Sequence, residues 1–231
     1  MKIIMKPAFL ALARLSKRFS RANLYEWLTE DLATLPPNAR ILCIGAGGIL
    51  DAMIKQTPGT ETVTIDIDEA RKPDIVMDTT AMTFEDKQFD AVYMMEVLEH
   101  VTSPRAALSE VQRVLKDGGR FVMSTPFIFG IHEEPWDYWR FSRHGLEHLL
   151  VDFAEQKIRP RNGYYTSIVV LFMRTIFSPG RKRQLIGGLA IILGLPFFAL
   201  LILLDRISPD DRCTTGYFVT CHKPLAQREA V

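Results

Sequence analysis

The sequence is poor in cysteine and has almost no net charge. Its 231 residues include only three cysteines, Cys43, Cys213 and Cys221, with no C-x-x-C pair and no histidine cluster beside them. A reduced, cytoplasmic-type compartment is therefore expected, and neither a disulfide framework nor a metal site is predicted. The formal net charge of +1 gives no overall attraction for nucleic acid, so a nucleic-acid partner is not expected.

Acidic residues are missing from the first 25 residues, which carry six lysines and arginines. Over residues 8–24 the helical period places Leu12, Leu15 and Phe19 on one face and basic residues on another. Such a helix can lie on an anionic membrane surface or pack on the domain, and both interpretations stay open. An organelle transit peptide also stays open, whereas the lack of an unbroken apolar core argues against a secretory signal.

Short apolar runs alternate with helical segments along residues 40–160, which is typical of a parallel sheet covered on both faces. Strands are expected at residues 41–44, 61–68, 74–77, 89–95, 120–125 and 156–160. Helices are expected at residues 24–35, 51–56, 103–115 (with Ser103 as the N-cap) and 146–153.

Three glycines follow the first of these strands. Gly45, Gly47 and Gly48 allow a sharp turn whose backbone can lie flat against a ligand. Dinucleotide-binding turns have a further glycine where this chain has Leu50, whereas S-adenosylmethionine (AdoMet), which has no phosphates, needs only G-x-G. Asp66 ends the second strand about 20 residues later and can accept both ribose hydroxyls of a nucleoside.

Taken in order, these motifs resemble a class I AdoMet-dependent methyltransferase of the type 11 kind. The matching stretches are Ile41–Gly48, Val63–Asp68, Asp78–Thr80, Phe84–Asp90, Glu96–Val101 and Glu110–Phe121. The resemblance implies an α/β fold with a Rossmann-like seven-stranded sheet, and AdoMet as the cofactor. It also implies a set of cofactor-binding residues: Gly45, Ala46 and Gly47 along the methionine part, Asp66 and Ile67 at the ribose and adenine, Asp78 and Thr79 at the adenine edge, and Met95 and Glu96 closing the pocket.

Two positions depart from that family. Most relatives have Asp or Glu in place of Cys43, and many have glycine in place of Ile49. The first departure removes a carboxylate that helps to order the amino end of the cofactor, directly or through water. A non-catalytic nucleotide-fold binding module is therefore one alternative. A nicotinamide-dependent oxidoreductase is another, which Leu50 argues against.

An aromatic loop, residues 125–141, follows the fifth strand at the edge where open α/β sheets bind ligands. Its candidate substrate-side residues are His132, Asp137, Tyr138 and Arg140. Similar H-x-x-P-x-D-Y-x-R stretches occur in methyltransferases thought to act on glycans or lipid-linked sugars. The alternative is a lid held by an Asp137–Arg140 ion pair, with aromatic side chains packed beneath it.

No catalytic residue can be carried over from the family. Methyl transfer from a sulfonium mainly needs alignment of the acceptor, and a general base is needed only for a weakly acidic acceptor. His132 is the candidate for such a base. His100 is expected to have a structural role instead, bonding the backbone near Ser103.

Charge is also missing from residues 185–204, a run long enough to cross a bilayer. Residues 215–223 are expected to form the last strand of the same sheet, so the apolar insertion has to return to the side it left. A shallow hairpin with residues 167–177 as its short limb, or a helix in the membrane plane, is favoured over a single span. The basic turn 181–183 also resists passage through lipid.

The expected organisation has five parts: a basic helical region (1–30), an AdoMet-binding core (31–162), a membrane-associating insertion between the last two strands (163–210), the final core strand (211–224) and a tail (225–231). The predicted function is methyl transfer from AdoMet to an amphiphilic small molecule (a lipid-linked glycan, a quinone precursor or a lipid). The predicted location is the cytoplasmic side of a membrane, by peripheral or monotopic attachment, with a single span as the minority interpretation.

Overall fold

The computed structural model describes residues 21, 23–177 and 180–226, so most of the predicted basic helix lies outside the described residues. The chain divides into two compact units. One comprises Glu26–Phe127, Ile131–Arg159 and Tyr217–Val231, and the other comprises Met1–Tyr25, Ile128–Gly130 and Pro160–Gly216. Each unit is described below by itself.

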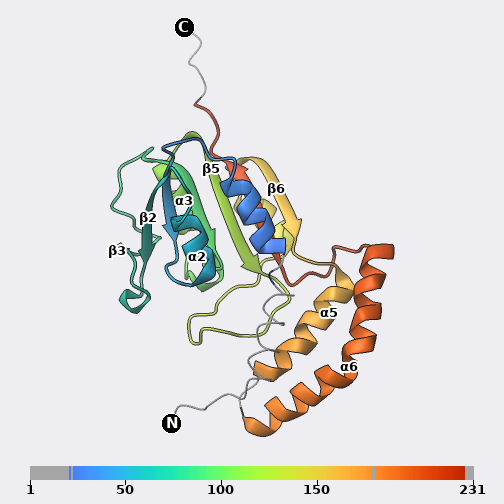
Figure 1. Ribbon diagram of the computed structural model, residues 1–231. Helices are drawn as coiled ribbons and strands as arrows, with labels where there is room; N and C mark the ends of the chain where they lie inside the picture. Colours follow the sequence, from blue (N-terminus) through green and yellow to red (C-terminus); the bar gives the residue numbers. More distant parts are fainter. Residues whose placement is uncertain (1–20, 22, 178–179, 227–231) are drawn as a thin grey trace. The chain divides into compact units, whose positions relative to one another are not determined.

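The first unit is built on a seven-stranded sheet with the strand order β3-β2-β1-β4-β5-β7-β6 (Figure 1). The strands are β1 (Arg40–Ile44), β2 (Glu61–Asp66), β3 (Ile75–Val76), β4 (Phe89–Met95), β5 (Leu115–Pro126), β6 (Ala154–Pro160) and β7 (Gly216–His222). Strands β1 to β5 are parallel. The sheet confirms the predicted α/β fold class, including the return of the chain to a final strand after the apolar insertion.

Strand β7 runs antiparallel to β5. Gly118, near the start of β5, donates its N–H to the carbonyl of Lys223 just beyond the end of β7 (3.0 Å). At the opposite ends of the same strands the rings of Phe127 and Tyr217 meet, with centroids 5.8 Å apart. The sheet is therefore mixed, and only its parallel part can form a nucleotide-type crevice.

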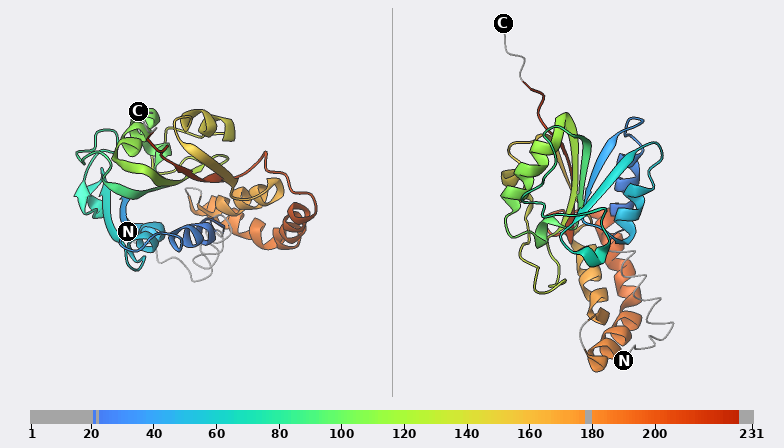
Figure 2. Two further views of the ribbon diagram at one scale, coloured as in Figure 1. Left: turned by 90° about the horizontal axis from the view of Figure 1, so that it is seen from above. Right: turned by 90° about the vertical axis from the view of Figure 1, so that its left-hand side faces the viewer.

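Helices cover both faces of the sheet (Figure 2). They are α2 (Gly48–Lys55), α3 (Pro104–Val114), α4 (Arg143–Leu149) and a helix over residues 23–32, with short 3₁₀ turns η1 (Glu69–Arg71) and η2 (Leu98–His100). Helices α3 and α4 lie on one face and α2 and the 23–32 helix on the other. Their apolar stripes bury the sheet residues, among which Phe89, Val92 and Phe121 are fully buried.

Several predicted boundaries were wrong. Strand β5 begins at Leu115, not at residue 120, because Leu115 pairs with Phe89 of β4 before a register shift. Helix α2 begins at Gly48 and α4 ends at Leu149. Ser103 stands at the N-cap of α3 but its side chain makes no capping hydrogen bond, so Pro104 is what favours the helix start there.

The second unit contains a helical hairpin of α5 (Tyr164–Met173), the 3₁₀ turn η3 (Arg174–Phe177) and α6 (Arg181–Ile207) (Figure 1). Its core consists of Val169, Met173, Ile176, Ile191, Phe198 and Leu201. The carboxylate of Asp205 accepts the N–H groups of Tyr165 (3.0 Å) and Thr166 (2.6 Å) in the first turn of α5, where a helix needs acceptors. A Cβ at Gly187 would lie 2.8 Å from Thr175 Oγ1, so glycine is required where the two limbs approach.

Helix α6 has an apolar face that α5 does not cover. The segment Lys182–Ile207 is the one helix among the described residues that is long and apolar enough to cross a membrane. Leu185, Leu189, Leu193, Phe197 and Leu200 are between 50% and 73% exposed, and they follow one stripe of the helix. A soluble protein rarely leaves such a stripe open to water.

Candidate functional site

The glycine turn lies between β1 and α2, where the strand order reverses. Strand β1 has β2 on one side and β4 on the other, and this switch point is where open α/β sheets bind ligands. Gly45, Gly47 and Gly48 have φ values of +95°, +85° and +83°, which side chains with a Cβ rarely adopt. A Cβ on Gly45 would lie 2.5 Å from Val97 Cγ2, whereas one on Gly48 would meet no atom within 4 Å. The turn therefore packs on one side and presents open backbone on the other.

Asp66 ties this turn to the end of β2. Its Oδ2 accepts the N–H of Ala46 (2.8 Å) and its Oδ1 accepts the N–H of Asp68 (2.9 Å). An ionised carboxylate has about four lone-pair positions, so both oxygens keep acceptor capacity for hydroxyl groups. The residue therefore lies where the sequence placed it, at the carboxyl end of β2 beside the glycines.

Asp51 is a further carboxylate under the turn, and the sequence pattern gave no reason to single it out. It is 8% exposed, and its Oδ2 accepts the N–H of Gly47 (2.9 Å), while its Oδ1 is buried without a hydrogen-bond partner among the described residues. Burial raises the pKa of the Cys43 thiol above its usual range, and the neighbouring charge of Asp51 raises it further. Cys43 is thus a neutral, buried thiol next to a buried carboxylate.

The other predicted cofactor-binding residues surround the same edge of the sheet. Ile67 is 72% exposed after β2. Met95 is the last residue of β4 and Glu96 follows it, with Glu96 Oε1 accepting the hydroxyl of Ser124 (3.0 Å). Asp78 is exposed and forms a turn with Thr80, whereas Thr79 is buried. The fold gathers these residues at the carboxyl ends of β2, β3 and β4.

The aromatic loop after β5 is held by the ion pair that the sequence suggested. Arg140 donates to both oxygens of Asp137, at 2.6 and 2.7 Å, and the Asp137 side chain is 2% exposed. The hydrogen bond from Arg140 lowers the pKa of Asp137 to about 2. Trp136, Tyr138 and Trp139 remain at least 41% exposed, so the part of the alternative interpretation in which aromatic side chains pack beneath the loop does not hold for these three.

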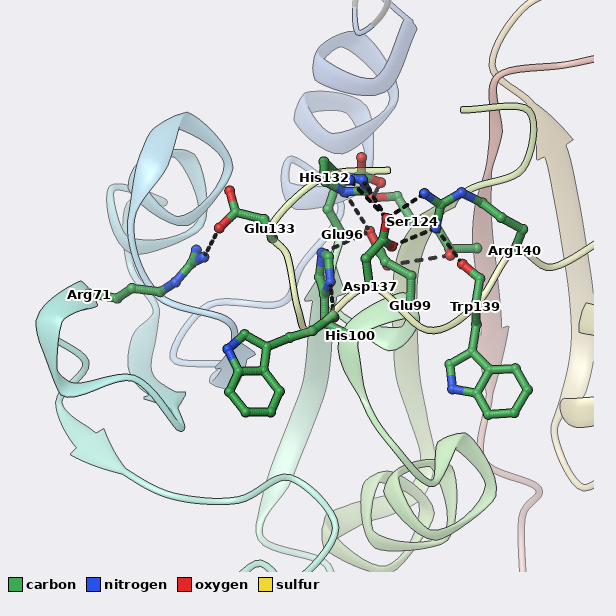
Figure 3. A network of polar contacts seen from close by, with 12 residues as sticks. Arg71, Glu96, Glu99, His100, Ser124, His132, Glu133, Asp137, Trp139 and Arg140 are labelled. Atoms are coloured by element: carbon green, nitrogen blue, oxygen red, sulfur yellow. Dashed lines mark hydrogen bonds and ion pairs between the residues drawn. The ribbon is translucent and has the colours of Figure 1, made fainter. Parts of the chain in front are cut away.

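His100 and His132 converge on the buried side chain of Glu99 (Figure 3). The Nε2 atoms of His100 and His132 lie 3.7 and 3.9 Å from Glu99 Oε1. His100 Nδ1 bonds the carbonyl of Trp136 at 2.7 Å, so its predicted contact near Ser103 was wrong. The potential ligand atoms of these three residues all lie within 4.8 Å of one another, close enough to hold one metal ion. Sequence analysis missed this group because 31 positions separate Glu99–His100 from His132.

A second contact joins the aromatic loop to η1. Arg71 Nη2 donates to Glu133 Oε2 (3.2 Å), and Arg71 Nε lies 4.0 Å from Asp66 Oδ2. Figure 3 shows the contact between Arg71 and Glu133, here named the Arg71–Glu133 latch. Because Arg71 also lies near Asp66, the latch connects the loop after β5 to the candidate ribose-binding carboxylate. Both of its side chains are about half exposed, 46% and 59%, so the latch can open at small cost.

Residues 42–123 match the family model described as "Methyltransferase domain", Methyltransf_11. A demethylmenaquinone methyltransferase of Renibacterium salmoninarum is 33% identical over 107 residues, which cover 42% of this chain and 45% of that protein. A ubiquinone biosynthesis O-methyltransferase of Ruegeria sp. (strain TM1040) is 39% identical over 112 residues, with the same two coverages. The chain thus spans less than half the length of these curated relatives.

Solved structures of similar fold extend over most of the chain at low identity. Phosphoethanolamine N-methyltransferase 2 of Haemonchus contortus, in complex with S-adenosyl-L-methionine, has a TM-score of 0.59 at 14% identity, covering 88% of this chain and 53% of that one. The cyclase SpnF has a TM-score of 0.55 at 17% identity, covering 86% and 80%. At such identities the likeness is one of fold.

Proposed function

We propose that this chain, which carries a class I S-adenosylmethionine-dependent methyltransferase domain of the type 11 group over residues 42–123, transfers a methyl group from AdoMet to an amphiphilic acceptor at a membrane surface. The observation that carries this proposal is the left-handed glycine turn at the switch point of the sheet, with Asp66 bonded to its Ala46 N–H. A turn with open backbone beside an acceptor for ribose hydroxyls suits a nucleoside without phosphates.

The residues around the turn fit AdoMet. Gly45 to Gly47 would lie along its methionine part and Asp66 would accept the ribose hydroxyls. The exposed side chain of Ile67 would cover one face of the adenine. AdoMet supplies a methyl group on a sulfonium, which is already a good leaving group, so these residues need only bind and orient it.

Asp51 would replace the carboxylate that relatives carry at position 43. Helix α2 places it under the turn, and the buried Oδ1 has acceptor capacity for the ammonium group of the methionine part. Lys55 Nζ lies 3.8 Å from the other oxygen, Oδ2, so the ammonium group of the cofactor would be a second cationic partner for this buried carboxylate. On this proposal the carboxylate has moved from position 43 to position 51, and the presence of Cys43 does not mean that the pocket has lost its function.

The aromatic loop would form the acceptor side, with His132, Asp137, Tyr138 and Arg140 as its polar residues. Asp137 lies 3.4 Å from His132 Nδ1, which favours a proton on that nitrogen and leaves Nε2 as the basic atom. His132 is therefore the candidate base for a hydroxyl acceptor. Relatives named for quinone biosynthesis make a quinone precursor the first acceptor to test.

The exposed stripe of α6 supports attachment to a membrane. Five large apolar side chains face outward along about four turns, and the helix begins with basic residues that can meet anionic headgroups. Flotation with anionic vesicles tests this. We expect wild type to float and a Leu189→Asp/Leu193→Asp variant to stay at the bottom, with Gly188→Ala as the matched control. Equal flotation of all three proteins would contradict membrane attachment through α6.

Calorimetric titration with S-adenosylhomocysteine tests the cofactor site. We expect micromolar binding by wild type and none by Asp66→Ala, whose thermal unfolding is measured alongside to show that it folds. No binding by folded wild type would favour the non-catalytic module, and binding of NADH in its place would favour the oxidoreductase. Methyl transfer from radiolabelled AdoMet to demethylated quinone precursors, lipids and lipid-linked glycans then identifies the acceptor.

A further inference from the structure

We propose that Glu99, His100 and His132 form a site for one divalent transition-metal ion on the acceptor side of the cofactor pocket. The three ligand atoms come from two elements: η2, which follows β4, and the aromatic loop after β5. They lie within 4.8 Å of one another. The metal site depends on none of the methyl-transfer chemistry, whereas its suggested role in the reaction rests on the proposed function.

The hydrogen bond of His100 fixes which of its nitrogens faces the site. A backbone carbonyl can only accept, so the 2.7 Å contact between His100 Nδ1 and the carbonyl of Trp136 requires the proton to be on Nδ1. In the neutral ring, Nε2 then presents a lone pair. That lone pair lies 3.7 Å from the carboxylate oxygen Glu99 Oε1.

His132 repeats this arrangement from the other side. Its Nδ1 lies 3.4 Å from Asp137 Oδ2, a carboxylate oxygen that also accepts a hydrogen bond from Arg140. The proton therefore belongs on Nδ1, and the Nε2 lone pair lies 3.9 Å from the same Glu99 oxygen. Three electron-pair donors thus face a common point.

Such a point attracts positive charge, part of which the nearby guanidinium of Arg140 supplies. A metal ion bound by the two imidazoles and Glu99 would add to it. The separations of 3.7 and 3.9 Å are too long for N–H···O hydrogen bonds. Two ligands each about 2.1 Å from a shared ion lie roughly 3.0–3.6 Å apart, which a small side-chain adjustment reaches. The separations therefore favour an ion between the side chains.

The surroundings also have the form of a metal site. Ligating histidines characteristically donate their second nitrogen to a carbonyl or a carboxylate, as His100 does to the carbonyl of Trp136. His132 has the carboxylate of Asp137 3.4 Å from its Nδ1. Glu99 is fully buried and its backbone carbonyl accepts the N–H groups of Tyr138 (3.0 Å) and Trp139 (3.1 Å), which holds its position. The His100 and His132 side chains are 20% and 23% exposed, which leaves a path for the ion from solvent.

Two imidazoles and one carboxylate select the class of ion. Nitrogen ligands suit zinc and neighbouring first-row metals more than magnesium or calcium, which prefer oxygen. Three protein ligands leave at least one coordination position open. An acceptor hydroxyl bound there would have a lowered pKa, so the ion would replace His132 as the group that activates the acceptor.

Metal binding by the full-length chain tests the proposal. The protein is stripped with a chelator and titrated with Zn²⁺ by calorimetry, and with Co²⁺ by its visible absorption, in a Cys213→Ser background that removes the half-exposed thiol. We expect one ion per chain. His100→Ala, His132→Ala and Glu99→Gln should each weaken binding at least tenfold, and Asp137→Asn should weaken it roughly tenfold because it only orients His132. His144→Ala, an exposed histidine outside the group, is the matched control.

Binding of S-adenosylhomocysteine, measured on the same variants, separates the outcomes. Unchanged cofactor binding with lost metal binding supports the site. Absence of metal binding in wild type, or equal metal binding in His100→Ala and His132→Ala, overturns it and leaves His132 as the candidate base. Loss of S-adenosylhomocysteine binding by wild type would instead refute the proposed function, and the metal titration would still decide the ion site.

Discussion

Moving the buried carboxylate from helix α2 back to strand β1 should preserve cofactor binding, whereas removing it should not. Asp51→Asn keeps an amide oxygen for the N–H of Gly47 but loses the negative charge at a position that is 8% exposed. A hydrogen bond to a charged group contributes about 1.5–3 kcal/mol, so S-adenosylhomocysteine should bind roughly 10- to 150-fold more weakly.

A truncated ligand separates ligand recognition from damage to the turn. Calorimetry compares S-adenosylhomocysteine with 5′-methylthioadenosine, which lacks the amino acid part. Asp51→Asn should weaken only the former, because Asp51 is proposed to contact the ammonium group. Equal weakening of both ligands would mean that Asp51 supports the glycine turn alone, and unchanged binding of both would refute its role.

The reciprocal exchange completes the test. Cys43→Asp alone should destabilise the fold, because it puts a second carboxylate beside Asp51 in a buried place where one of the two must take up a proton. The double variant Cys43→Asp/Asp51→Asn should recover stability and most of the affinity for S-adenosylhomocysteine. If the double variant binds S-adenosylhomocysteine as weakly as Asp51→Asn does, a carboxylate at position 43 cannot replace the one at position 51.

Three further predictions concern the aromatic loop and the helical hairpin. Glu133→Gln opens the Arg71–Glu133 latch and should speed dissociation of S-adenosylhomocysteine in stopped flow, and an unchanged rate would show that the latch does not gate the pocket. The pKa of Asp137 is lowered to about 2. Its ion pair should therefore add about 2 kcal/mol to the free energy of unfolding above pH 5, and this contribution should disappear as the pH falls through 4 towards 2. The Asp137→Asn variant should show a flatter dependence of stability on pH over this range. Gly187→Val should force the limbs of the hairpin apart, costing about 1–3 kcal/mol in denaturant unfolding, while Gly188→Ala, whose Cβ meets no atom within 4 Å, should be neutral.

The sequence by itself determined the parts of this protein that depend on local pattern. Strand β4 was predicted at its observed bounds because residues 89–95 form an apolar run between turn residues. The glycine turn and Asp66 were recognisable because chain geometry requires glycine, and a carboxylate at a strand end, at fixed spacing. The long apolar helix α6 followed from the absence of charge over residues 185–204.

Boundaries that depend on partners were decided by the tertiary structure. Strand β5 extends back to Leu115 because Leu115 pairs with Phe89 of β4. The next four residues, K-D-G-G (116–119), are typical of a turn and gave no indication of a strand. The cap at Ser103 was expected from residue type, but no capping bond forms. Local propensity is weak compared with hydrogen bonds and burial supplied by distant elements.

The chemistry of the site was also decided by tertiary contacts. Asp51 is a candidate site residue only because α2 packs it against Cys43. His100 is one only because the aromatic loop brings Trp136 and His132 into contact with it. A buried carboxylate and a fixed imidazole tautomer are properties of a shared, low-dielectric environment that no single segment possesses. The sequence therefore indicated the candidate ligand site, and the packing of separate segments decided which charges meet there.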